Sequence, residues 1–469
     1  MESDVLLGRT RELGALRRAF DRPQASLVRV AGLPGVGKTR LVRQAAADFR
    51  SLYHRVPPLP EADQRAALAR TLSERADSRA GASRGIAEPG SWAGLFATLA
   101  TSGPQDRPLL VIVDDAHRWE ESRARVGPAL DDTLDEARSR GQPLHLVLVS
   151  PELPAAPGSD EASALDVVLR PLPFRAAAAF LPGASARERL HAYAVFGGVP
   201  GHLAHVDRGT SLGANVRRLV LDANGSLADA PLVLMERLFQ TPSRYAAILA
   251  ALAEGEGDWG VVHAGLSDLS AGGQVAPYLK RLEEVGLIEA RRSLDASPRT
   301  RSRRYRIRDP YVAFWFRFVL RSHHLRHDKA YERLWTDVVR PSLMRHTASI
   351  LPAVCRDFMA NDAIEVLGSN ARETGSLWGT GYDIPVAGIL TSGAAYYGVL
   401  PGAEPQADTA ALARLDAEIR ATRYGFGRER RLRIVFAGGE PSVPLRREAA
   451  RRDDVVVVGY DALYGRDLR

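Results

Sequence analysis

Residues 32–39 read GLPGVGKT, and this stretch decides the fold. It lies between a short apolar run at residues 27–31 (LVRVA) and a helical pattern that opens at Thr39. A GxxxxGK(S/T) string between a strand and a helix is typical of a phosphate-binding P-loop. Its glycines let backbone amides wrap around phosphates, the lysine reaches the β- and γ-phosphates, and the hydroxyl offers a ligand to Mg²⁺. The alternative is a degenerate loop without nucleotide. The predicted nucleotide-binding residues here are Gly32, Pro34, Gly35, Val36, Gly37, Lys38, Thr39 and Arg40.

A second acidic element follows the apolar run at residues 109–113 (LLVIV). Asp114 is expected to hold Mg²⁺ together with Thr39, and Asp115 to orient or deprotonate the attacking water. Ser150, which closes LHLVLVS at residues 144–150, stands where a polar sensor of the γ-phosphate would lie. An ordinary strand end remains the alternative for the two acids. The predicted catalytic residues are Lys38, Asp114, Asp115 and Ser150.

Short, fully apolar runs separated by helical patterns predict a parallel sheet covered on both faces. The chain has 469 residues, enough for about three domains. We expect an α/β P-loop core at residues 1–170, a helical lid at 171–239, a winged helix-turn-helix at 240–320, and a connector with a C-terminal α/β domain at 321–469.

Composition limits the cellular setting. Cys355 is the single cysteine, which excludes an intramolecular disulfide framework and a cysteine-based zinc cluster. No apolar run reaches the roughly 18 to 20 residues of a membrane helix, and the N-terminus lacks an apolar signal core. We therefore expect a cytoplasmic protein without a membrane partner.

The basic residues are unevenly distributed. Of 63 lysines and arginines only three are lysines (Lys38, Lys280 and Lys329), so a lysine inside the P-loop is informative. Residues 291–308 carry eight arginines and one aspartate, a charge of +7 that equals the net charge of the whole chain. An arginine finger is chemically plausible, and Arg138 and Arg140 are candidates.

The order helix, short helix, helix, strand, turn, strand from residue 241 onward predicts a winged helix with a wing hairpin. Eight arginines on phosphates would give a slope of log K against log salt near about −7, an upper limit. We thus expect contact with double-stranded DNA; the alternative is a winged helix that packs on the nucleotide domain as a regulatory lid. The predicted nucleic-acid contacts are Gln274, Tyr278, Lys280, Arg281, Arg299, Arg301, Arg303 and Arg304.

Several strings together resemble the archaeal-type ATPase family of P-loop proteins, of the AAA+-related STAND class. Beside the two motifs above they are GRTREL (8–13), GGVP (197–200), PYLKRLEEVGLIEARR (277–292) and YRIRDPYVAFWFRFV (305–319). The resemblance covers nearly the whole chain and implies ATP with Mg²⁺ as ligands, which the motifs alone do not separate from GTP. It also implies that Arg9 lies near the adenine and that Gly198 and Pro200 approach the nucleotide from the lid. A simple helix break is the alternative for GGVP.

The same resemblance implies a C-terminal domain similar to restriction endonucleases of the PD-(D/E)XK kind. Asp383 is kept, but the helix acid would fall near Pro352, and Tyr and Gly occupy the acid-x-Lys strand at residues 394–402. No lysine follows Lys329. Asp383 alone cannot assemble a metal cluster, so we expect a degenerate nuclease fold kept for shape, docking or nucleic-acid binding.

Three functions remain open on the sequence. The leading hypothesis is an ATP-hydrolysing switch that couples its nucleotide state to the winged helix and C-terminal domain, with a homo-oligomer or another protein as possible partner. The second is a nucleic-acid-binding or scaffold protein with a structural nucleotide. The weakest is a defence-type nuclease.

Overall fold

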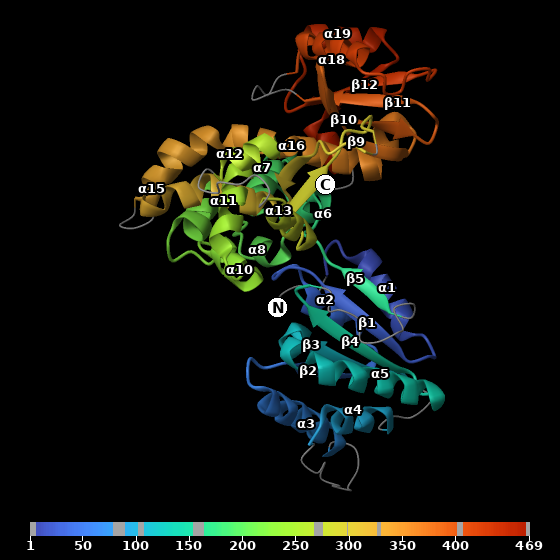
Figure 1. The fold of residues 1–469 in the computed structure, drawn as a ribbon. Helices are drawn as coiled ribbons and strands as arrows, with labels where there is room; N and C mark the ends of the chain where they lie inside the picture. Colours follow the sequence, from blue (N-terminus) through green and yellow to red (C-terminus); the bar gives the residue numbers. More distant parts are fainter. Residues whose placement is uncertain are drawn as a thin grey trace. The chain divides into compact units, whose positions relative to one another are not determined.

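The computed structural model describes residues 6–77, 90–101, 107–152, 164–266, 275–297, 299–325, 330–400 and 407–465. They belong to two compact units, Met1–Arg170 and Pro171–Arg469 (Figure 1). Within the described ranges no helix combines the length and the apolar character that crossing a bilayer requires.

A five-stranded, all-parallel sheet forms the centre of the first unit, in the order β2-β3-β4-β1-β5. Every residue of β1, β3 and β4 is buried, as expected for strands covered on both faces. Because β4 lies between β1 and β3, the loops that follow these three strands share one edge of the sheet. The strands are β1 (Ser26–Ala31), β2 (Arg50–Arg55), β3 (Leu109–Asp114), β4 (Leu144–Ser150) and β5 (Leu165–Val168).

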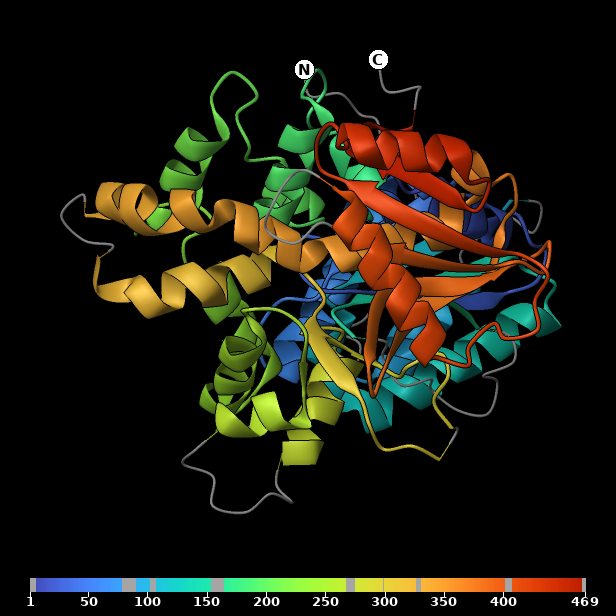
Figure 2. The ribbon, with the colours of Figure 1, turned by 90° about the horizontal axis from the view of Figure 1, so that it is seen from above.

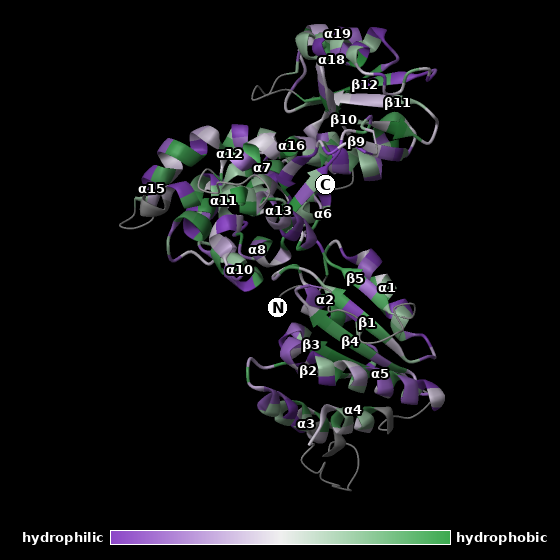
Figure 3. Ribbon diagram, in the orientation of Figure 1, coloured by the Kyte–Doolittle hydropathy of each residue, from purple (hydrophilic) through white to green (hydrophobic). Residues whose placement is uncertain are grey.

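Alternate strand residues enter two different hydrophobic cores. In β3, Val111 packs with the helices α3, α4 and α5, whereas Ile112 packs on the other face with α1 and α2. Figure 3 shows the contrast between the hydrophobic strands and the more polar helix α5. The helices are α1 (Thr10–Phe20), α2 (Lys38–Ala45), α3 (Glu61–Asp77), α4 (Trp92–Thr101), the 3-10 helix Ala116–Ser122 and α5 (Arg123–Ser139).

This arrangement confirms the predicted fold class, an α/β protein built on a parallel P-loop sheet with a separate C-terminal α/β part. The apolar runs correctly indicate β1, β3 and β4. Strands β2 and β5 were not predicted, because β2 buries only Leu52 and His54 of its six residues and β5 only Val167 of its four. The two strands form the edges of the sheet, where solvent exposure removes the continuous apolar pattern.

The second unit begins with helices that Figure 2 shows beside its C-terminal sheet. The division of this unit into lid, winged helix and C-terminal domain stays a prediction. Its first elements are α6 (Phe174–Ala178), α7 (Ala186–Phe196), α8 (Pro200–Leu203), α9 (Leu212–Val216), a π-helical turn (Arg217–Leu221) and α10 (Ala230–Leu238).

A small antiparallel sheet of order β6-β8-β7 follows, packed with three helices. Helix α11 comes first, then β6, then α12 and α13, and the hairpin β7–β8 closes the group. The elements are α11 (Pro242–Leu252), β6 (Gly257–Asp258), α12 (Trp259–Ala264), α13 (Val275–Glu284), β7 (Ile288–Arg291) and β8 (Arg304–Ile307).

The aromatic stretch at residues 310–319 is buried throughout and connects this group to the preceding helices. The indole Nε1 of Trp315 donates to the Ala228 carbonyl at 2.7 Å, so the buried polar atom is satisfied. The elements here are α14 (Pro310–Phe314), a π-helical turn (Trp315–Val319), a 3-10 segment (Leu320–Leu325), α15 (Tyr331–Arg333), a second π-helical turn (Leu334–Val339), α16 (Arg340–Asp362) and α17 (Ile364–Leu367).

A mixed sheet of order β13-β12-β11-β10-β9 ends the chain. The pairs β9–β10 and β10–β11 are antiparallel, and β11–β12 and β12–β13 are parallel. Helices α7, α16 and α20 cover one face, and α18 and α19 cover the other. The elements are β9 (Ala371–Gly379), β10 (Tyr382–Leu390), β11 (Ala395–Val399), α18 (Thr409–Ala421), β12 (Arg431–Ala437), α19 (Val443–Arg451), β13 (Val455–Gly459) and α20 (Tyr460–Tyr464).

Candidate nucleotide site

The P-loop connects the end of β1 to the start of α2, and two of its glycines are required by the backbone. Gly32 has φ of 150°, and a Cβ there would lie 2.4 Å from the Leu169 carbonyl oxygen. Gly37 caps α2 with φ of 97°, a left-handed conformation that favours glycine. The loop therefore holds its amides at the N-terminus of a helix, where anions are stabilised.

Lys38 folds back over this loop. Its ammonium donates to the carbonyls of Gly32 at 2.5 Å and Leu33 at 3.1 Å. Burial lowers the pKa of Lys38, while the charges of Asp114 and Asp115 act in the opposite direction. Both acceptors are neutral carbonyls, so a phosphate oxygen would make a stronger, charge-assisted bond to the same ammonium.

Asp114, at the end of β3, is 6% exposed. Its carboxylate accepts three hydrogen bonds. Its Oδ2 accepts from the Thr39 hydroxyl at 2.6 Å and from the Tyr53 hydroxyl at 2.7 Å, and its Oδ1 accepts from the Asp115 amide at 2.9 Å. Burial, followed by the bond to Asp114, raises the pKa of Tyr53 to about 12. A hydroxyl and a carboxylate that meet beside a phosphate-binding loop are the oxygen donors that Mg²⁺ prefers, so these residues fit that ion.

Asp115 has the left-handed backbone conformation, with φ of 58°, the only non-glycine residue with positive φ in the described ranges. Its Oδ2 accepts from Arg55 Nε at 2.8 Å and lies 3.6 Å from Arg118 Nε. The acid predicted to act on water is thus held by two guanidinium groups. A strained backbone at such a position is a common property of functional sites.

Strand β2 supplies two site residues that the sequence analysis missed. Tyr53 and Arg55 come from this edge strand and contact Asp114 and Asp115. The parallel register pairs Arg55 with Asp114, which places both at the same edge as the P-loop. The alternating polar pattern of RSLYHR was the signal that could have revealed the strand.

Other predicted site residues lie at the same edge. Ser150 is in register with Ala31, the residue before the loop, and its hydroxyl donates to the Glu152 carbonyl. Val36 is buried in the core beside α2, whereas Arg40 is exposed on the first turn of that helix.

Arg9 lies against the P-loop in the described structure. It is 5% exposed, and its Nη2 donates to the carbonyls of Arg170 at 2.5 Å and Val36 at 3.3 Å. Its Nη1 pairs with Glu12 at 3.1 Å. Arg9 thus fastens the P-loop to the end of the first unit, and its contact with adenine stays a prediction.

The two arginine-finger candidates lie at the end of α5. Arg138 Nε donates to the carbonyl of Ala25, the residue before β1, at 3.3 Å, and Arg140 pairs with Glu136. The P-loop follows the other end of β1, six residues or about 20 Å away. Neither arginine therefore reaches the P-loop of its own chain from this position. As an arginine finger, either one would have to contact the nucleotide of another copy of the protein.

Gly198 and Pro200 belong to the second unit, and each has a local structural role. Gly197 ends α7 with φ of 67°, and Pro200 starts α8. A Cβ at Gly198 would lie 2.0 Å from the Leu172 carbonyl oxygen. A helix break with close backbone packing accounts for this string, and a contact with nucleotide stays a prediction.

Acids of its own unit pair with four of the eight arginines in the basic segment at residues 291–308, so fewer than the upper limit of eight are available to phosphates. Arg291 contacts Glu256, Arg306 contacts Glu289, and Arg304 forms a two-pronged pair with Asp383 at 2.8 and 3.0 Å. Arg303 lies 3.8 Å from Glu283. Within the described ranges, the guanidinium groups of Arg299 and Arg301 contact no acid.

The preceding helix α13 is also internally paired. Tyr278 accepts a hydrogen bond from Arg244, and both Lys280 and Arg281 lie 3.8 Å from Glu284. Gln274 lies outside the described residues.

In the hairpin loop between β7 and β8, residues 293–295 rest on strands β9 and β10. Leu294 N donates to the Ser376 carbonyl at 3.0 Å, and Trp378 N donates to the Ser293 hydroxyl at 3.0 Å. Asp295 accepts from the Tyr382 hydroxyl at 2.6 Å, and Arg304 stacks over the Trp378 ring at 4.7 Å. Part of the basic segment expected to contact DNA is therefore docked on the C-terminal sheet.

The carboxylate of Asp383 forms an ion pair with Arg304, beside the docked residues. No group of three or more His, Cys, Asp or Glu with metal-binding geometry occurs in the parts of the chain that the structure describes. Cys355 is buried in α16, and burial raises the pKa of its thiol.

One protein family matches within the first unit. Residues 5–149 match the model of the AAA ATPase domain. An uncharacterized protein of Methanocaldococcus jannaschii is 31% identical over 157 residues, which are 32% of this chain and 34% of that protein. The chain thus spans about a third of the length of this relative.

Solved structures are similar at low identity. The Walker-type ATPase of Pyrococcus abyssi is 18% identical with a TM-score of 0.46, over 66% of this chain and 96% of that chain. Cdc6p from Pyrobaculum aerophilum is 14% identical with a TM-score of 0.32, over 72% and 96%. Over residues 5–149, the first unit is thus similar to the AAA ATPase domain family.

Proposed function

We propose that the chain is an ATP-hydrolysing switch whose nucleotide state controls the second unit. The observation that supports this most is the meeting of Lys38, Thr39 and Asp114 at one edge of the parallel sheet. The loop amides and Lys38 would bind the phosphates, while Thr39 and Asp114 would hold Mg²⁺. When bound, this ion would draw charge from the transferring phosphoryl group.

Asp115 is the proposed base. Arg55 and Arg118 hold its Oδ2, and we propose that this pairing keeps the carboxylate turned away from the attacking water. Hydrolysis should therefore be slow until a rearrangement releases the carboxylate. A base held by a removable partner suits a switch better than an enzyme with constant turnover.

The output module in this proposal is the second unit. The element order from α11 to β8 favours a winged helix, and the mixed sheet with Asp383 is proposed to be a degenerate nuclease-like domain. ATP can change this module only if it binds more tightly to one arrangement of the protein than to another.

Double-stranded DNA is a second proposed ligand. Fewer arginines of the basic segment support this contact than the sequence suggested. Arg299 and Arg301 support it, since their guanidinium groups contact no described acid. Two phosphate contacts on a docked loop are consistent with weak binding that does not depend on sequence.

ATP hydrolysis by wild type and Lys38→Ala tests the main proposal. Loss of a charge that stabilises the transition state should lower the rate about 100-fold or more. Lys280→Ala is the matched control, because that lysine has a 79% exposed side chain on α13. Equal rates for wild type and Lys38→Ala would refute the proposal, and the same assay with GTP measures the choice of base.

A further inference from the structure

A cavity of about 620 Å³ opens at one edge of the C-terminal sheet. Its apolar floor consists of core residues and their neighbours, namely Val366, Leu367, Leu390, Leu432 and Val456. Its rim comes from the turn between β10 and β11, the loop before β12 and the residue Asp453 before β13. The cavity is thus apolar inside and charged at its mouth.

The cavity is separate from Asp383. That residue lies near the start of β10, where it pairs with Trp378 of β9, whereas the cavity takes Leu390 at the other end of the strand. Seven residues of strand correspond to about 23 Å. The docked residues 293–295 and the cavity therefore lie near opposite ends of β10.

Phe426 stands at the mouth of the cavity with 80% of its surface exposed. The other exposed large hydrophobic residues of the described chain reach at most 51%. Gly425 and Gly427 flank it with φ of 68° and 81° and make the tight turn that presents the ring. Because Phe426 also lines the cavity, a ligand bound there would cover the exposed ring.

The turn that carries this ring is fixed at both sides. The Tyr397 hydroxyl donates to the Tyr424 carbonyl at 2.6 Å, and Arg428 Nη1 donates to the Gly393 carbonyl at 3.0 Å. A turn whose backbone is fixed in this way is already organised for a ligand, which reduces the entropy lost on binding.

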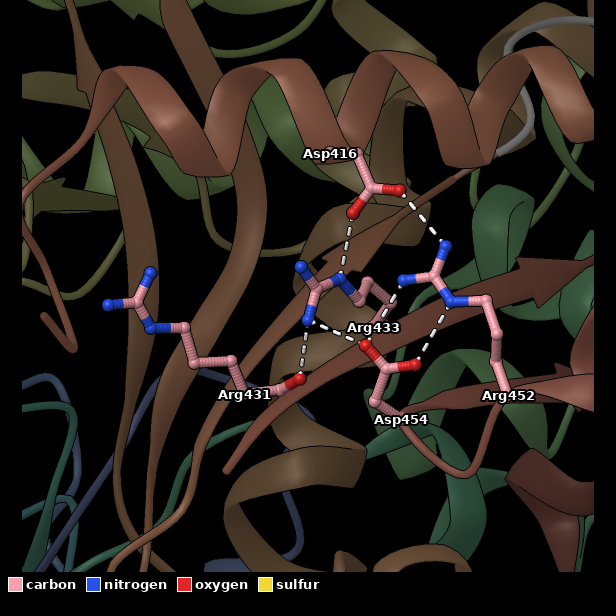
Figure 4. A network of polar contacts seen from close by, with 5 residues as sticks. All are labelled: Asp416, Arg431, Arg433, Arg452 and Asp454. Carbon is pink, nitrogen blue, oxygen red and sulfur yellow. Dashed lines mark hydrogen bonds and ion pairs between the residues drawn. The ribbon is translucent and has the colours of Figure 1, made fainter. Parts of the chain in front are cut away.

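An ion-pair network supports the edge beside the cavity (Figure 4). Arg433 joins Asp416 and Asp454 at 2.8 Å each, and Arg452 bridges the same two acids at 3.1 Å. Arg431 enters this network only through its backbone carbonyl, and its guanidinium points away.

Among the described residues, the charged side chains at the mouth of the cavity form no ion pairs with that network. Arg431 lies 5.4 Å from the centre of the Phe426 ring. In the described chain, the side chains of Glu429, Arg430 and Asp453 contact no oppositely charged group. The mouth thus combines an exposed ring, guanidinium groups and carboxylates.

We propose that this cavity binds a nucleoside phosphate, either free or as one unit of a single strand of nucleic acid. A base would stack on Phe426, guanidinium groups of Arg428, Arg430 and Arg431 would meet phosphate, and Asp453 would accept from an amino group or a sugar hydroxyl. A protein side chain would also fill an apolar floor, but the combination of a ring with neighbouring arginines favours the nucleotide.

The test uses the full chain with Lys38→Ala, Arg299→Ala and Arg301→Ala, which weaken the two other candidate sites. A labelled oligothymidine strand is titrated by fluorescence anisotropy, and thymidine monophosphate is added as competitor. Phe426→Ala should weaken strand binding about 5- to 100-fold, the range found for loss of one stacked base. Phe426→Tyr keeps the ring and should bind within about twofold of the parent. The matched control is Val443→Ala, at another exposed apolar residue on α19.

The outcomes separate clearly. Displacement by thymidine monophosphate supports a free ligand, and binding of the strand without displacement supports the strand; both uphold the site. Equal affinity of Phe426→Ala and its parent overturns the proposal. No strand binding, together with self-association that Phe426→Ala abolishes, also overturns it and makes the cavity a protein contact.

Discussion

Binding of duplex DNA by the basic segment should depend on salt far more weakly than its eight arginines suggest. Four of them contact acids, and Arg292 and Arg308 have other interactions. Arg299 and Arg301 remain for phosphates, which gives a slope of log K against log salt near about −1.8. Between 50 and 200 mM salt the affinity should then fall about 12-fold, whereas eight contacts would lower it about 20,000-fold.

The measurement is fluorescence anisotropy of a labelled duplex at four salt concentrations. Wild type should show the shallow slope, and the double variant Arg299→Ala/Arg301→Ala should lose most of it. Arg447→Ala/Arg451→Ala removes the same charge from exposed positions on α19 and is the matched control. Asp383→Ala releases Arg304 and should steepen the slope by about 0.9.

Two results would refute this reasoning. A wild-type slope near about −7 would mean that the hairpin loop leaves β9 and β10 and that all eight arginines meet phosphate. Absence of measurable affinity at about 50 mM salt would remove the segment as a DNA interface.

The remaining predictions concern the nucleotide site and one buried acid. Arg55→Ala should raise ATP turnover several-fold by releasing Asp115; unchanged turnover in a steady-state assay would show that the pair does not restrain the base. Tyr53→Phe should shift the Mg²⁺ dependence of ATP hydrolysis several-fold with nucleotide binding within about twofold, because only one bond to Asp114 is lost; an unchanged Mg²⁺ titration contradicts this. Burial raises the pKa of Asp309 to about 7, so the native state keeps a proton that the unfolded chain releases above about pH 4. The stability that this proton provides is therefore present below pH 4 and lost between about pH 4 and 7, by at most about 4 kcal/mol. Asp309→Asn should flatten the decline in chemical-denaturation curves across this range, and an undiminished decline would contradict the assignment.

The parts of the fold that were predictable are those with local signals. The P-loop string is complete within eight residues, and β1, β3 and β4 are buried on both faces, so each reads as a continuous apolar run. Strand β2 is half exposed and lacks such a run, which is why Tyr53 and Arg55 were missed.

Charge pairing was not predictable for a different reason. The partners of the basic segment are Glu256, Glu283, Glu289 and Asp383, of which Glu256 and Asp383 lie far from it in sequence. A formal charge of +7 counted along the chain is therefore not the charge at the surface. The cavity beside Phe426 could not be predicted from the sequence either, because it is formed by segments that are separate in the chain.

The pair between Arg304 and Asp383 also limits what protein engineering can achieve at this sheet. A guanidinium on a carboxylate leaves no excess negative charge, so Arg304 acts as a built-in counter-ion where a designer would want to place a metal. New carboxylates and a lysine on β11 would not suffice, because the arginine would compete with any incoming cation. Replacement of Arg304 by a neutral residue would have to come first.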